Sequence, residues 1–196
     1  MQLKAKRQMS TETLVLAALM TALVVVFQYL GTTTTFFGPF STAVALIPII
    51  IGTAMCGSGV GAWLGFVFAI VVFFTGGANL FFAFSIPGTI ITVLGKGMAC
   101  GHFSGFIYEL LEKKNKTVAT YAAALSCPVV NTGVFLLGSA LFFMPAADQI
   151  ASAVGISESG FGVFVALAFG NFLFEIIMCV VLAPVIVRVL NMCKKK

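Results

Sequence analysis

The chain has 196 residues, of which 60% are hydrophobic and only 9% are charged. Soluble domains usually carry about 25% charged residues, so this composition excludes an ordinary soluble domain and favours a protein that faces lipid. The net charge of +5 comes mainly from cations clustered at the chain ends and in one loop. Such clusters indicate orientation anchors beside a membrane rather than a nucleic-acid surface.

Six apolar stretches follow one another along the chain and predict six membrane-spanning helices in a single domain over residues 1–196. Ser85 suits the N-cap of the fourth span and Pro87 suits its first turn. The segment 144–159 is expected to be a polar loop. The fold class is therefore all-α integral membrane. The expected spans are 13–30, 41–55, 60–74, 86–111, 118–143 and 160–192.

The Lys and Arg residues predict the orientation of these spans. Ten of the eleven lie at the N-terminus, after the fourth span or at the C-terminal end. The loops at 31–40, 75–85 and 144–159 contain no Lys or Arg. Because loops rich in Lys and Arg stay on the cytoplasmic side, both termini are expected to be cytoplasmic and these three loops to face outward.

Polar residues inside the predicted spans are the first candidates for function, because each ionisable group in hydrocarbon costs about 2.5–3.5 kcal/mol. Lys96, Asn131 and Asn171 all lie roughly 15–18 Å below the outer ends of their spans. Glu175 follows Asn171 by one helical turn on the same face, and Thr132 adds a hydroxyl group. The sequence therefore predicts that polar side chains from three helices meet at a similar depth.

Two interpretations of this convergence stay open. In one, Lys96 pairs with Glu175 in a buried structural network that holds the helices together. In the other, the polar groups form the floor of an outward-facing pocket, where Lys96 meets an anion and the amides bind polar groups. Aromatic outer loops favour the pocket. The loop residues expected to border it are Phe36, Phe37, Phe40 and Asn79.

Small residues recur at helical spacing in three of the predicted spans. Glycine occupies every fourth position over 57–65 and over 97–105. Such stripes allow two helix backbones to approach closely, and packing within the bundle is the simpler explanation. Ala18 and Ala22 form a similar small-residue face on the first span. That face is a candidate surface for docking a separate subunit.

Several kinds of chemistry are not supported by any motif. The stretch Gly95-Lys96-Gly97 lacks the pattern of a phosphate-binding loop, so ATP hydrolysis by that route is excluded. His102 is the sole histidine and no cysteine pair has ligand spacing, so no metal site is expected. His102 is instead expected to be a hydrogen-bonded core residue. The chain is not expected to be an enzyme or to hold a cofactor.

Two stretches carry a resemblance to a known family. One is Phe37-Gly-Pro-Phe40, followed by Ile47-Pro48, Gly52 and Gly57-x-x-x-Gly61-Ala62. The other is Cys127-Pro-Val-Val-Asn-Thr132. With six spans and the Ala18-x-x-x-Ala22 face, the whole chain resembles the substrate-binding S components of energy-coupling factor (ECF) vitamin transporters. It departs from many members in having Gly57-Ser58-Gly59 at a cytoplasmic turn where they carry Gly-Pro.

The resemblance implies a binding subunit of an ECF-type ABC importer in the plasma membrane of a prokaryote. Such a subunit captures a water-soluble vitamin near the outer face, under the outer loops. It works with a transmembrane coupling protein and two ATPase subunits, and Ala18 and Ala22 match the docking face for the coupling protein. ATP is then hydrolysed on other chains, in agreement with the missing nucleotide motif.

The residues favour a small carboxylated vitamin as the ligand. One buried Lys96 suits a carboxylate, and Asn131 with Asn171 suit amide or hydroxyl groups. Pantothenate fits best, and a neutral aromatic vitamin such as riboflavin comes next because of the many phenylalanines. A self-sufficient secondary transporter of a small solute is the alternative function, in which Glu175 carries a proton.

Overall fold

A computed structural model gives the structure of residues 10–33 and 42–193. All the regular structure in these residues is helical, which confirms the predicted all-α class. The elements are α1 Thr11–Thr33, α2 Thr42–Cys56, α3 Ser58–Phe74, α4 Asn79–Phe82, α5 Ile86–Leu111, α6 Lys116–Phe142, the 3₁₀ turn η2 Met144–Ala146, α7 Ala147–Val154 and α8 Phe161–Cys193.

Four of the described helices are long and apolar enough to cross a membrane: α1, α5, α6 and α8. Two further helices, α2 and α3, are apolar but shorter. All six overlap the stretches predicted from the sequence. The membrane character of the chain is therefore supported, while the six crossings and their orientation stay predictions.

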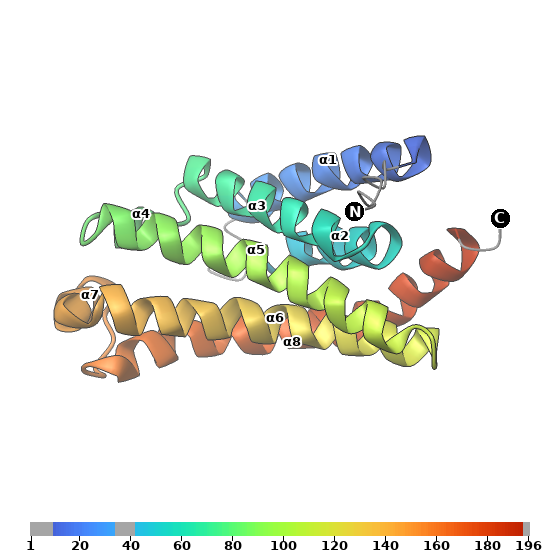
Figure 1. The fold of residues 1–196 in the computed structure, drawn as a ribbon. Helices are drawn as coiled ribbons and strands as arrows, with labels where there is room; N and C mark the ends of the chain where they lie inside the picture. Colours follow the sequence, from blue (N-terminus) through green and yellow to red (C-terminus); the bar gives the residue numbers. More distant parts are fainter. Residues whose placement is uncertain (1–9, 34–41, 194–196) are drawn as a thin grey trace, which may run out of the picture.

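The long helices run alongside one another in an elongated bundle (Figure 1). Helix α5 packs between α3 and α6, α8 packs on α6 and α2, and α1 packs on α2 and α3. The short helices α4 and α7 lie at one end of this bundle. The first turn of α1, the turn between α5 and α6, and the last turn of α8 lie at the other end (Figure 1).

Side-chain caps define where two of the long helices begin. The Ser85 hydroxyl oxygen accepts a hydrogen bond from the Gly88 amide at 3.2 Å, and Pro87 lies in the first turn of α5, as predicted. Asn115 Oδ1 accepts from the amides of Thr117 at 2.9 Å and Val118 at 3.2 Å, which fixes the start of α6. Both caps satisfy backbone donors that the helix itself cannot pair.

The glycine stripes bring α3 and α5 into backbone contact. A methyl group at Gly65 would collide with the Gly97 carbonyl, and one at Gly61 would collide with the Gly101 carbonyl. Small residues therefore serve packing within the bundle, as predicted. Gly57 does not belong to this contact, because it lies just before α3 with φ +94°, a conformation that favours glycine.

The segment 144–159 is not simply the loop expected from the sequence, because α7 and η2 occupy much of it. Helix α7 is amphipathic and buries Ala147, Ile150 and Ala151 on one face, and Gly155 ends it with φ +71°. The buried face forms an outer apolar cluster with Phe143, Val163 and Phe164. This outer apolar cluster is separate from the main core of the bundle.

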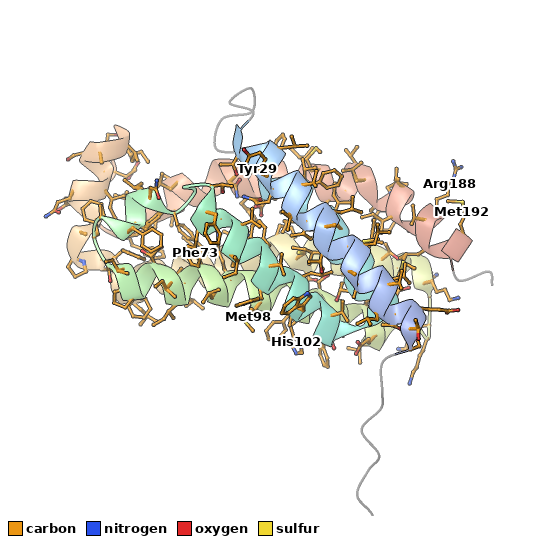
Figure 2. All side chains as sticks on the ribbon, turned by 90° about the horizontal axis from the view of Figure 1, so that it is seen from above. Tyr29, Phe73, Met98, His102, Arg188 and Met192 are labelled. Carbon is orange, nitrogen blue, oxygen red and sulfur yellow. The ribbon has the colours of Figure 1, made fainter. Side chains whose placement is uncertain are left out.

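Much of the outer surface of the long helices is apolar, as expected of a surface that faces lipid (Figure 2). Met98 and Phe103 of α5, for example, are both exposed. The prediction of a core position for His102 is wrong, because this side chain is exposed on α5 beside Phe103, with ring centroids 5.8 Å apart. The polarity of a lone histidine gave no information about which face of α5 it occupies.

Candidate functional site

A pocket of about 190 Å³ opens between α5, α6 and α8, close to the end of the bundle that carries α4. Its wall combines apolar and aromatic side chains with a lysine, a threonine and two carboxamides. This composition suits a small ligand that carries a few polar groups. The lining residues are Gly77, Leu80, Phe81, Lys96, Asn131, Thr132, Phe135, Leu167, Ala168 and Asn171.

Three long helices place the polar lining at one level. Lys96 on α5, Asn131 on α6 and Asn171 on α8 each lie about three turns, roughly 15 Å, from the end of the helix that points toward α4 and α7. Because α6 packs against both α5 and α8, side chains at the same level converge between them. The predicted depth of these residues thus agrees with their positions in the structure.

Glu175 lies beneath this lining and is fully buried. Asn171 Nδ2 donates a hydrogen bond to Glu175 Oε1 at 2.7 Å. Asn131 Nδ2 lies 3.3 Å from Oε1 and 3.4 Å from Oε2 of the same carboxylate. The carboxylate therefore links α6 to α8 through two carboxamides. These hydrogen bonds offset part of the large free-energy cost of burying a charge.

Lys96 is half-buried, and its ammonium nitrogen lies 5.7 Å from the centre of the Phe135 ring. This distance falls within the range of a cation–π contact. Glu175 exerts a Coulombic attraction on the ammonium group. The carboxylate of Glu175 also accepts hydrogen bonds from the amides of Asn131 and Asn171. Lys96 thus lines the pocket beside an aromatic ring, with a buried carboxylate near enough to attract its charge.

The structure brings together most of the residues that the sequence singled out inside the spans. Lys96, Asn131, Thr132 and Asn171 line the pocket, and Glu175 supports two of them from below. Their role in ligand binding stays a prediction.

Of the four loop residues predicted for the site, only Asn79 lies in the described part of the chain. Asn79 is the first residue of α4, is exposed, and is not part of the pocket wall. The neighbouring Leu80 and Phe81 line the pocket instead. Phe36, Phe37 and Phe40 lie outside the described residues, so their predicted place above the pocket stays untested.

Helical spacing could have revealed three lining residues that sequence reasoning missed. Phe135 follows Asn131 by four positions, and Leu167 and Ala168 precede Asn171 by four and three. Residues at these spacings share a helix face. Phe81 contacts Phe135 at a ring-centroid distance of 5.6 Å, so the aromatic wall joins α4 to α6.

A second concave region lies between α1 and α3. It is an open apolar groove of about 750 Å³ lined by Ala18, Trp63 and neighbouring residues. Trp63 is 53% exposed and donates a hydrogen bond through Nε1 to Thr21 Oγ1 at 3.2 Å. Ala18 and Ala22 are both exposed, so the predicted docking face is accessible from outside the bundle.

Within the described part of the chain, no group of His, Cys, Asp and Glu side chains is arranged to hold a metal ion. The comparison with curated proteins and the comparison with solved structures gave no match. The family model described as "ECF transporter, substrate-specific component" matches residues 12–187. Since this match covers nearly the whole chain, the protein belongs to the family of substrate-specific components of ECF transporters.

Proposed function

We propose that this chain captures a small, carboxylated, water-soluble vitamin in the pocket between α5, α6 and α8. The observation that carries the proposal is the meeting of Lys96, Asn131, Thr132 and Asn171 on one pocket wall. Members of this family bind small substrates for transport. A pocket with one ammonium group and two carboxamides has the donors and acceptors that such a substrate requires.

The Lys96 ammonium group favours an anionic ligand. It lines the pocket and lies 5.7 Å from the centre of the Phe135 ring. A carboxylate placed beside it gains a charge-assisted hydrogen bond, which is roughly twice as strong as a neutral one. Pantothenate fits this requirement best, because it combines a carboxylate with an amide and hydroxyl groups. Riboflavin is the next candidate, since the aromatic wall suits a flat ring system.

We further propose that residues 1–196 form one domain that crosses the plasma membrane of a prokaryote six times, with both termini in the cytoplasm. The turn between α5 and α6 carries Lys113 and Lys114, and it lies at the end of the bundle opposite to α4 and α7 (Figure 1). Cations at that end support a cytoplasmic location. The pocket then opens toward the outer face.

The same proposal assigns the energy source to other chains. Substrate-specific components work with an ECF module, and we expect a transmembrane coupling protein and two ATPase subunits as the partners. The exposed Ala18 and Ala22 and the groove beside Ala18 provide a surface where a partner helix can approach closely.

Two experiments test the proposed function. Mass spectrometry of the purified chain should identify a small anionic molecule that copurifies with it. Pantothenate at a hundred times its dissociation constant should stabilise the chain by about 2.7 kcal/mol, and Lys96→Met should remove most of that gain. A thermal shift that is the same for Lys96→Met and for Lys116→Met, a control at the start of α6, would contradict the assigned site.

Reconstitution of the chain alone separates this function from secondary transport. Binding without uptake, and uptake only after the ECF module and ATP are added, are the expected results. Uptake by the isolated chain along an ion gradient would support the secondary transporter instead.

A further inference from the structure

We propose that Glu175 is a positioning residue that fixes the Asn131 carboxamide, so that the pocket selects ligands carrying an N–H or O–H donor in addition to an anion. This inference rests on the proposed function of the pocket. The geometry behind it is the set of contacts from Asn131 and Asn171 to one fully buried carboxylate, at 2.7 to 3.4 Å.

The chemistry of the carboxylate determines which way the amides point. An ionised carboxylate only accepts hydrogen bonds, whereas a carboxamide donates from its nitrogen and accepts at its oxygen. The nitrogen of each amide must therefore face Glu175. For Asn131 this constraint is strong, because its nitrogen approaches both carboxylate oxygens.

The oxygen of the Asn131 amide is left without a partner by this arrangement. Asn131 is 3% exposed, and its Oδ1 has no hydrogen bond within the described residues. A buried acceptor without a partner costs about 1–3 kcal/mol. Asn131 also borders the pocket, while its Oδ1 itself has less than 1 Å² of accessible surface. A ligand donor that moves the covering side chains and reaches Oδ1 removes this cost on binding.

Lys96 and Asn131 then place two different demands on one ligand. The ammonium group can only donate, so it requires an acceptor such as a carboxylate. The Asn131 oxygen can only accept, so it requires a hydroxyl or amide N–H. The chemical class that satisfies both is a carboxylate with a hydroxyl or secondary amide group a few bonds away.

Replacing Glu175 by glutamine should make the Asn131 amide require a ligand acceptor in place of a ligand donor. The glutamine amide keeps one oxygen, which can accept from Asn171, but it places N–H donors where the other oxygen was. One of the two contacts of the Asn131 nitrogen then meets a donor instead of an acceptor. This repulsion favours the orientation in which the Asn131 oxygen faces the glutamine. The Asn131 nitrogen then borders the pocket, and the site prefers a ligand acceptor.

The test uses pantothenate and its three singly methylated analogues, each of which lacks one of its hydrogen-bond donors. In the original chain, one of the analogues should bind about tenfold to a hundredfold more weakly than pantothenate, because a buried acceptor stays unpaired. In Glu175→Gln, the ratio of that analogue's dissociation constant to the dissociation constant of pantothenate should fall to about one or below. In Glu175→Asp, which keeps two acceptor oxygens, the ratio should be retained.

A purely structural role for Glu175 predicts a different outcome. Glu175→Gln would then weaken pantothenate and all its analogues by the same factor, and the ratio would not change. Asn131→Ala is the matched control, because it removes the amide through which Glu175 acts. Adding Glu175→Gln to Asn131→Ala should leave the ratio unchanged, and a further change in ratio would overturn the inference.

A ligand-free measurement keeps this inference separate from the proposed function. In the nuclear magnetic resonance spectrum of the chain in nanodiscs, Glu175→Gln should shift the side-chain N–H₂ signals of Asn131 and Asn171. The exposed Asn191 should be unaffected. If pantothenate fails to bind but these shifts occur, the ligand assignment is wrong and the positioning role stands. Unchanged Asn131 and Asn171 signals would overturn the positioning role.

Discussion

Removal of the Lys96 charge should discriminate between the ligand-binding and the structural interpretation of the polar cluster. Lys96→Met keeps an unbranched side chain against Phe135 and removes the ammonium group. Loss of one partner from a desolvated, hydrogen-bonded charge pair costs about 2–5 kcal/mol. Lys96 is half-buried, so solvent screening places the expected loss at about 2–3 kcal/mol, roughly 30- to 150-fold in the dissociation constant.

Calorimetric titration of the purified chain with pantothenate and with its alcohol, panthenol, measures this effect. Panthenol lacks the carboxylate, so its affinity should change by less than about threefold in Lys96→Met. The difference between the two ligands gives the interaction of Lys96 with the carboxylate, in the manner of a double-mutant cycle. Lys96→Arg, which keeps the positive charge, should retain part of the preference for pantothenate.

The thermal stability of the ligand-free variant completes the comparison. If Lys96 serves ligand binding, Lys96→Met should leave the ligand-free stability within about 1 kcal/mol of the original, because the amides of Asn131 and Asn171 still hydrogen-bond the Glu175 carboxylate. Breaking a buried ion pair would instead cost about 3–5 kcal/mol, because it leaves a charge uncompensated. An equal loss for both ligands, together with a large loss of stability, would refute the ligand-binding role.

Three further predictions concern docking and packing. Ala18→Leu should reduce copurification with the coupling protein at least tenfold while leaving ligand affinity unchanged, whereas Ala166→Leu on the exposed face of α8 should affect neither. Gly65→Ala should destabilise the chain by about 1–3 kcal/mol in thermal unfolding, because the methyl group meets the backbone of α5. Gly59→Ala, with open space around it, should instead stabilise α3 by up to about 1 kcal/mol, and the same sign for both changes would contradict the packing assignment. Asn115→Ala should cost about 1 kcal/mol through loss of the α6 cap, and an unchanged melting temperature would contradict that role.

The long helices were predictable because their signals are local. Apolar stretches of span length, the Ser85 cap and the glycine spacing each depend on residues close in the sequence, and each agrees with the structure. Helix α7 was missed because only eight residues form it and polar residues surround it. Its amphipathic spacing, with Ala147, Ile150 and Ala151 on one face, was the available signal.

The sequence predicted how far along their helices the candidate-site residues lie, but it did not predict which of their side chains are in contact. Counting residues from the helix ends placed Lys96, Asn131 and Asn171 at one level, and the structure has them on one pocket wall. The partners of Glu175 could not be derived, since the rotation of each helix depends on packing against its neighbours. That rotation directs the amides of Asn131 and Asn171 into hydrogen bonds with the carboxylate.

The outer apolar cluster around α7 has a consequence for the kinetics of exchange. Leu80, Phe81 and Leu167 pack against it and also line the pocket, while the main core of the bundle forms a separate cluster. Segments that share few apolar contacts with the rest of a protein can open by themselves at low free-energy cost. We therefore expect the mouth of the pocket to open while the bundle remains intact. If the pocket holds a ligand as proposed, the rate at which that ligand leaves can change independently of the melting temperature.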